Sequence, residues 1–299
     1  MSWLNKLFVL MLHLVPKFII RFFSKKYIAG PTLDHAVQKI KDLNSRGIMA
    51  TIDILGEEID REEDALAVVR EYKEVLVAIR KHQLDANISV KPTHLGLKID
   101  KNFCLENMRA IVKEAKSYQN FVRIDMEDHT CTSDTIEMYL ALKKEFDNVG
   151  VVIQAYLRRT MDDLRALVEE RANLRLCKGI YLEPKSLAYR DPAVVNQNFN
   201  YALEKLLSHG CYAGIATHDE KLIWFALSQI DKLNLKKEVY EFQMLLGVTE
   251  DLRDLLVKAG HRMRIYVPFG KHWYAYSMRR LKENPNVAVS ILKNIFSRH

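Results

Sequence analysis

The sequence predicts one (βα)8 barrel of the TIM type, distorted and preceded by extra N-terminal helices. Its 299 residues exceed the roughly 250 that such a barrel commonly needs. From residue 45 onward, short β-rich segments alternate with longer amphipathic segments, which is the pattern of parallel βα units. Eight β-rich segments occur. A doubly wound sheet is the alternative, but no G-x-G-x-x-G follows the first of them.

Residues 1–44 are expected to form a helical segment outside the catalytic barrel, which spans residues 45–299. The stretch 7–23 is strongly apolar, but His13, Pro16, Lys17 and Arg21 interrupt it. It therefore lacks the roughly 18–20 apolar residues of a spanning helix. A helix docked on the barrel, an interfacial membrane anchor and a targeting segment remain alternatives. Residues 1–33 hold five basic residues and no acid, which favours peripheral contact with an anionic membrane surface.

The strands and helices of the barrel follow from the spacing of apolar residues. Helices are expected where apolar residues recur at intervals of three and four, at residues 61–82, 104–117, 132–145, 160–170, 196–207 and 220–230. Strands are expected at residues 48–54, 87–91, 121–125, 149–154, 174–178, 214–217, 239–243 and 264–267.

Composition excludes several classes of protein. Hydrophobic residues make up 48% and charged residues 28% of the chain, as in ordinary globular proteins. Much of the net charge of +7 lies in residues 1–33, so no basic nucleic-acid-binding domain is indicated. The four cysteines form no CxxC pair, which argues against a disulfide framework or a cysteine-based zinc site. A reducing, cytoplasmic compartment is expected.

Polar residues gather where the predicted strands end, and active sites of this fold lie at that end of the barrel. Buried charges are costly unless they are paired or bind a ligand, so these residues predict a functional site. Asp53 and Arg123 are also plausible ion-pair partners inside the barrel, without a substrate role. His94 and His218 lack the spaced partners of a metal site, so no metal is expected.

Cations outnumber acids among these residues, which indicates an anionic ligand. Arg279 and Arg280 are about 100° apart on a helix and can approach a carboxylate from two sides, with Lys91 completing the cage. The run Lys178, Gly179 and Ile180 permits close approach of a phosphate or a ring, and Thr217 and His218 follow the next strand. A phosphate-bearing cofactor is therefore favoured. Lys91 or Lys178 as the Schiff-base residue of an aldolase, and a non-enzymatic binding module, remain alternatives.

The ordered motifs resemble the flavin-dependent proline dehydrogenase family. They are RIDMED (123–128), VVIQAY (151–156), RLCKGIY (175–181), IATHD (215–219), EFQMLLGV (241–248), RIYVPFG (264–270) and YSMRRLKENPN (276–286). The resemblance extends from residue 51 to residue 286. It implies a distorted (βα)8 barrel that binds FAD at its carboxyl end and oxidises L-proline to Δ1-pyrroline-5-carboxylate, by hydride transfer to flavin N5.

The resemblance also implies roles for individual residues. Asp125 matches the family's active-site acid and Arg175 the arginine beside the flavin. Lys91, Arg279 and Arg280 would hold the substrate carboxylate, and Glu283 would pair with the arginines. The remaining matches are walls of the proline pocket, at Tyr266, Leu246 and Tyr276, and FAD contacts, at Met126, Gln154, Lys178, Gly179, Ile180, Thr217 and His218.

The family passes its electrons to a membrane quinone, so a quinone is the expected electron acceptor. The sequence ends at His299 without a second catalytic domain. We therefore expect a monofunctional enzyme whose product goes to a separate pyrroline-5-carboxylate dehydrogenase. The apolar, basic N-terminus would serve as a contact with the cytoplasmic membrane.

Overall fold

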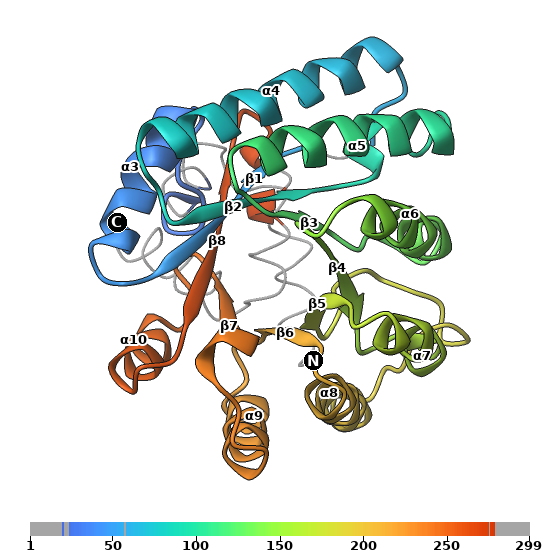
Figure 1. Ribbon diagram of the computed structural model, residues 1–299, viewed down its shortest axis with the longest axis vertical. Helices are drawn as coiled ribbons and strands as arrows, with labels where there is room; N and C mark the ends of the chain where they lie inside the picture. Colours follow the sequence, from blue (N-terminus) through green and yellow to red (C-terminus); the bar gives the residue numbers. More distant parts are fainter. Residues whose placement is uncertain (1–19, 21–23, 57, 275, 279–299) are drawn as a thin grey trace, which may run out of the picture.

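Eight parallel strands close into a barrel in sequence order, which confirms the predicted fold class (Figure 1). The computed structural model describes residues 20, 24–56, 58–274 and 276–278. Pairing of β1 with β8 completes the ring. The strands are β1 (Met49–Ile54), β2 (Ala86–Val90), β3 (Val122–Ile124), β4 (Val149–Gln154), β5 (Asn173–Cys177), β6 (Tyr212–Ala216), β7 (Tyr240–Leu245) and β8 (Met263–Phe269).

A helix follows each of the first seven strands and lies on the outside of the barrel (Figure 1). The apolar sides of these seven helices pack against the outward-facing residues of the strands, and together they form the main hydrophobic core. The helices are α4 (Glu62–Lys81), α5 (Lys101–Ser117), α6 (Thr132–Glu145), α7 (Thr160–Glu169), α8 (Pro192–Ser208), α9 (Glu220–Lys232) and α10 (Glu250–Lys258), and the 3-10 turns are η2 (Thr93–Leu95) and η3 (Lys237–Val239).

Helix α3 (Leu33–Asn44) precedes the barrel and packs against β1 and β8, where the ring closes. It buries Ala36, Val37, Ile40 and Leu43. The predicted division between residues 44 and 45 stays a prediction. No helix within the described ranges is long and apolar enough to cross a membrane.

Most element boundaries agree with the sequence to within a few residues. Helix α8 begins four residues earlier than predicted, because the Asp191 side chain accepts a hydrogen bond from the Ala193 amide and Pro192 occupies the first turn. Strand β8 continues through Pro268, which interrupts a strand pattern in sequence. Proline has no N–H to donate, but the Pro268 carbonyl accepts a hydrogen bond from the amide of Ala29, which precedes the barrel.

The inside of the barrel is polar, unlike the aliphatic layers usual for this fold. Hydrogen bonds join strands that are not neighbours, so the side chains that make them must point inward. Tyr266 on β8 reaches Asp125 after β3, and Arg175 on β5 reaches Ser89 on β2. These buried side chains, which point into the barrel, lie directly beneath the carboxyl ends of the strands and form a polar floor there.

Candidate active site

A cavity of about 1010 Å³ opens at the carboxyl end of the barrel. This volume is at the upper end of the range for ligand pockets. Nine of the predicted site residues line it: Lys91, Asp125, Met126, Gln154, Arg175, Ile180, His218, Tyr266 and Tyr276.

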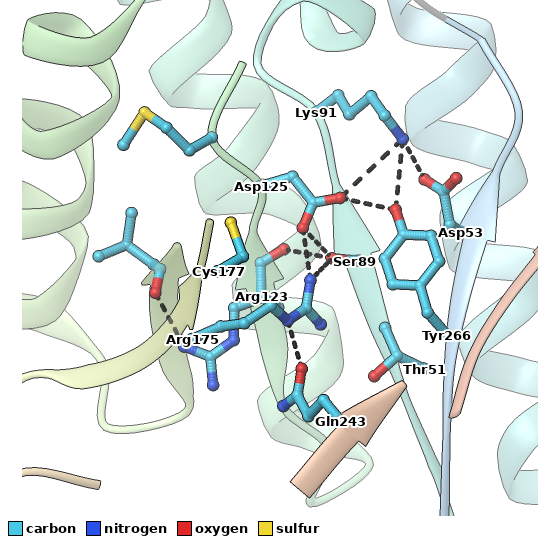
Figure 2. A network of polar contacts seen from close by, with 12 residues as sticks. Thr51, Asp53, Ser89, Lys91, Arg123, Asp125, Arg175, Cys177, Gln243 and Tyr266 are labelled. Carbon is cyan, nitrogen blue, oxygen red and sulfur yellow. Dashed lines mark hydrogen bonds and ion pairs between the residues drawn. The ribbon is translucent and has the colours of Figure 1, made fainter. Parts of the chain in front are cut away.

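Asp125 lies at the centre of the polar floor (Figure 2). Its Oδ1 accepts hydrogen bonds from Ser89 Oγ at 2.5 Å and from Arg175 Nη1 at 2.7 Å. Its Oδ2 accepts from the Tyr266 hydroxyl at 2.7 Å and lies 3.9 Å from Lys91 Nζ. Two cations and two hydroxyl groups from three strands or their ends, β2, β5 and β8, therefore converge on one carboxylate.

Lys91 is held as a cation by two buried acids. Its Nζ lies 2.5 Å from Asp53 Oδ1 and 3.4 Å from the Tyr266 hydroxyl. Burial opposes the charged ammonium, but attraction to Asp53 and Asp125 outweighs it and raises the pKa of Lys91 above its ordinary value. A Schiff-base lysine needs a lowered pKa, so Lys91 is unsuited to that alternative.

Asp53 is a structural partner of Lys91, as the ion-pair interpretation predicted, and it also lines the cavity. Only 1% of its side chain is exposed. Burial raises the pKa of Asp53 to about 6, even though Lys91 lowers it. Arg123 lies deeper, where its guanidinium bonds to Asn173 and to the Val151 carbonyl.

Tyr266 stands between the two acids and Arg175. Burial and the neighbouring carboxylates of Asp125 and Asp53 keep the pKa of Tyr266 well above its ordinary value, so its hydroxyl remains a donor. The Arg175 guanidinium lies 5.3 Å from the centre of the Tyr266 ring. The aromatic side chain thus has a polar role in addition to packing.

Gln154 lines the cavity, and its side-chain amide is only partly hydrogen-bonded within the described residues. Its Nε2 donates to the carbonyls of Met126 and Glu127 at 3.1 and 3.2 Å. Within the described part of the chain, its buried Oε1 has no hydrogen-bond partner. Such an atom is costly unless a ligand donates to it, so Gln154 is suited to bind an N–H group.

The segment after β5 places its three predicted contacts differently. Ile180 lines the cavity, whereas Lys178 lies outside the lining and pairs with Asp219 at 2.7 Å. Gly179 has φ of +104°, and a Cβ there would lie 2.1 Å from the Tyr156 ring. The close approach that requires glycine is therefore made by Tyr156 of this chain itself.

The loops after β3 and β5 are joined by a buried acid. Glu183 accepts a hydrogen bond from the backbone amide of His129 at 2.9 Å, and its carboxylate also pairs with the His129 imidazole. The Tyr156 hydroxyl lies 3.5 Å from the same carboxylate. These contacts fix the loop that carries Gly179 beside the cavity.

His218 lines the cavity with both ring nitrogens engaged by the protein. Its Nε2 accepts from the Leu245 amide at 3.2 Å, so Nδ1 carries the proton and donates to Thr249 Oγ1 at 2.9 Å. A ligand would thus meet the ring rather than a nitrogen. Thr217 is buried outside the lining, and its hydroxyl accepts from the Asp219 amide.

The remaining predicted pocket residues differ in their placement. Leu246 belongs to the hydrophobic core, and its neighbour Leu245 lines the cavity instead. Tyr276 lines the cavity on the side of the segment after β8. Arg279, Arg280 and Glu283 lie outside the described residues, so their roles stay predictions.

Sequence reasoning missed Ser89 and did not assign Gln243 or Cys177 to the site. All three point into the barrel, and each stands two residues from another inward polar residue, Lys91, Glu241 or Arg175. Every second residue of a strand points to the same side, so the position of each residue two places from a predicted inward polar residue could have identified it. No group of three or more metal-binding side chains occurs among the residues that the structure describes.

Comparison with known proteins gives a consistent result. A family model described as proline dehydrogenase matches residues 36–291. The chain is 38% identical over 278 residues to proline dehydrogenase 1 of Bacillus subtilis strain 168, covering 93% of this chain and 92% of that protein. It is 35% identical to the proline dehydrogenase of Deinococcus radiodurans, with 91% and 89% covered. The crystal structure of proline utilization A from Bdellovibrio bacteriovorus, inactivated by N-propargylglycine, superposes with a TM-score of 0.82 at 27% identity, covering 87% of this chain and 32% of that one.

Proposed function

Since this chain belongs to the proline dehydrogenase family, we propose that it oxidises L-proline to Δ1-pyrroline-5-carboxylate with FAD as its cofactor, the first step of proline catabolism. The observation that carries the proposal is the convergence of Lys91, Arg175 and Tyr266 on Asp125 at the floor of the cavity. A Schiff-base aldolase is disfavoured by the raised pKa of Lys91 and by the position of Lys178, which pairs with Asp219 outside the cavity lining.

Lys91 would bind the carboxylate of proline, together with Arg279 and Arg280. Its ammonium is kept charged by Asp53 and Asp125, so a positive charge is available to the substrate at neutral pH. Asp125 would supply the negative charge opposite the cationic ring nitrogen of proline. Tyr266 and Tyr276 would form walls around the ring, with Leu245 in the place predicted for Leu246.

The described residues fit a flavin. Gln154 presents a buried, unpartnered acceptor within the described chain, which suits an N–H group of a heteroaromatic ring. Met126, Ile180 and His218 add apolar and aromatic surface to the cavity. FAD, when bound, would supply at N5 the acceptor for the hydride that leaves the proline carbon beside nitrogen.

Arg175 would stabilise negative charge at the flavin. Its guanidinium is buried between Asp125 and Gln243, with only 8% of the side chain exposed. A fixed cation in a dry site stabilises developing charge more strongly than one in water. Lys178, Gly179 and Thr217 do not line the cavity, but each directly adjoins a lining residue in the chain, and we extend the proposed FAD site to them on that basis.

The electrons would pass to a membrane quinone, and the product to a separate pyrroline-5-carboxylate dehydrogenase. The acid-free basic residues 1–33 support peripheral contact with the cytoplasmic membrane. Protein lacking residues 1–25 should therefore sediment with anionic liposomes less than the full chain does. Equal sedimentation would refute this part of the proposal.

The first test is the visible absorption spectrum of the purified protein, before and after anaerobic addition of L-proline. Flavin bands that bleach with proline are the expected result. A spectrum that proline leaves unchanged would overturn the substrate, and absence of flavin after incubation with FAD would overturn the cofactor. Asp125→Asn serves as the comparison variant, because it keeps the size of the side chain and one acceptor oxygen but removes the negative charge, and it should lose bleaching.

A further inference from the structure

A chain of hydrogen bonds runs beneath the site, from β8 across β7 to Arg175. Arg264 Nε donates to Glu241 Oε1 at 2.7 Å, and Gln243 Nε2 donates to the same oxygen at 2.6 Å. Gln243 Oε1 then accepts from Arg175 Nε at 2.5 Å, and Arg175 Nη1 donates to Asp125. Figure 2 shows the last two links.

The chemistry of the donors and acceptors fixes the direction of every hydrogen bond in this series. A guanidinium only donates, so Gln243 must present its carbonyl oxygen to Arg175. An ionised carboxylate only accepts, so Gln243 must direct its NH2 group to Glu241. Burial opposes ionisation of Glu241, but the Arg264 charge prevails and lowers the pKa of Glu241 to about 2. Glu241 thus stays an acceptor at all working pH values.

The barrel is built to admit this amide. Gly214 on β6 lies beside Gln243, and a Cβ at residue 214 would lie 2.6 Å from Gln243 Nε2. The backbone of Gly214 has no left-handed φ, so space rather than backbone conformation accounts for glycine there. Glu241, Gln243 and Arg264 are all nearly fully buried, which protects the orientation from exchange with water.

We propose that Glu241 is a positioning residue: by accepting from Gln243 it fixes the amide that orients the Arg175 guanidinium toward Asp125. Neither Glu241 nor Arg264 lines the cavity, so their influence on a ligand passes through Gln243 and Arg175. The kinetic consequences rest on the proposed function, whereas the orientation of Arg175 can be measured without cofactor or substrate.

The test removes Glu241 and Arg264 together, because loss of either one alone would leave a buried unpaired charge. In Glu241→Met/Arg264→Met, the Gln243 amide loses the partner that selects its orientation. Side-chain Nε–H exchange of Arg175, observed by nuclear magnetic resonance in the cofactor-free protein, should become at least about tenfold faster. The signal is assigned with Arg175→Lys. Thr51→Val is the matched control, because it removes the part-buried Thr51–Asn87 hydrogen bond elsewhere in the barrel interior.

The kinetic test is a double-mutant cycle on the holoenzyme. Glu241→Met/Arg264→Met should lower kcat by about tenfold and change KM for proline less, since the proposed carboxylate ligands are untouched. In a Gln243→Met background the same pair should have no further effect on kcat, because no amide remains to be oriented. Gly214→Ala, which displaces the amide without touching the ion pair, should resemble the double variant in both measurements.

Two results would overturn the inference. One is Arg175 Nε–H exchange that stays at the native rate in a folded double variant, or in Gly214→Ala if the double variant does not fold. The other is additive losses of kcat in the Gln243→Met background, which would indicate a general effect on barrel packing. Failure of the proposed function would instead leave the exchange result intact and abolish only the response to proline.

Discussion

Replacement of Lys91 by Met tests how the site maintains its buried charges. In the native protein Lys91 Nζ lies 2.5 Å from Asp53 Oδ1, and the Asp53 side chain is 1% exposed. Burial raises the pKa of Asp53 to about 6, with Lys91 opposing the shift and Asp125 adding to it. Without Lys91, burial and Asp125 still raise the pKa of Asp53, and only the hydrogen bond with Tyr266 still lowers it. We expect Asp53 to be protonated at neutral pH in the Lys91→Met variant, as documented for buried carboxyls with pKa values of about 8–9.

The effect on stability follows from proton linkage. A carboxyl whose folded pKa exceeds its unfolded value of about 3.9 binds more protons when folded, so stability falls as pH rises. Between about pH 5 and pH 7.5, a folded pKa near 6 costs the native protein about 1.4 kcal/mol through Asp53. A folded pKa above about 8 would cost the variant about 3.3 kcal/mol over the same interval. The Lys91→Met variant should therefore lose about 2 kcal/mol more than the native protein does between these pH values.

Urea denaturation at the two pH values measures the free energy of unfolding of each protein. Comparing how much this free energy changes with pH in the variant and in the native protein cancels any loss of packing that is independent of pH. The matched control is Lys91→Met/Asp53→Asn, in which no titrating group remains at residue 53 and the extra dependence should disappear. Parallel stability curves for native protein and Lys91→Met would refute the reasoning, because they would mean that Asp53 does not depend on Lys91 for its charge.

Three further predictions test other parts of the site. Gly179→Ala should displace the loop after β5, because the new Cβ would lie 2.1 Å from the Tyr156 ring; the flavin content of the purified protein measures this, and unchanged content would contradict it. Tyr266→Phe removes a 2.7 Å hydrogen bond to Asp125 and should lower kcat/KM by about tenfold, whereas an unchanged value would exclude a role for the hydroxyl. Glu183→Ala should lower the free energy of unfolding by about 1–3 kcal/mol in thermal or urea denaturation, because the buried Glu183 carboxylate accepts the hydrogen bonds from His129 and Tyr156 that join the two loops, and native stability would refute that account.

Much of the fold was predictable because the barrel depends on local patterns. Most strands alternate outward apolar and inward polar residues, and the helices that follow the first seven strands each have one apolar side, so repeats of the same unit specify the architecture. Deviations occur where a single residue sets a boundary. The Asp191 side chain starts α8 earlier than the apolar pattern indicates, and Pro268 lies within β8 although proline usually ends a strand pattern.

The site was predictable only in part, because sequence identifies strand ends but not partners across the barrel. Lys91, Asp125 and Arg175 were expected at the carboxyl end, and they meet there. Ser89 was missed because it lies inside a strand, and its contact with Asp125 depends on the closure of β2 against β3. The role of Gly179 was predicted from its lack of a side chain and from the family resemblance, whereas its neighbour Tyr156 comes from another strand end.

The polar interior also explains why two inward positions on the strands are glycine. Arg123 and Gln243 are large, and a Cβ at Gly150 or Gly214 would lie 2.4 Å from Arg123 Nη1 or 2.6 Å from Gln243 Nε2. In this deeper part of the barrel interior, the space that a side chain at the glycine would fill is therefore occupied by a long polar side chain from the neighbouring strand. Buried polar groups stabilise a fold only when their hydrogen bonds are satisfied. The arrangement must therefore preserve the hydrogen bonds of Arg123 and Gln243 as well as the packing. A larger residue at Gly214 would thus disturb Gln243, which holds Arg175, and one at Gly150 would disturb the hydrogen bonds of Arg123, even though neither glycine lines the cavity.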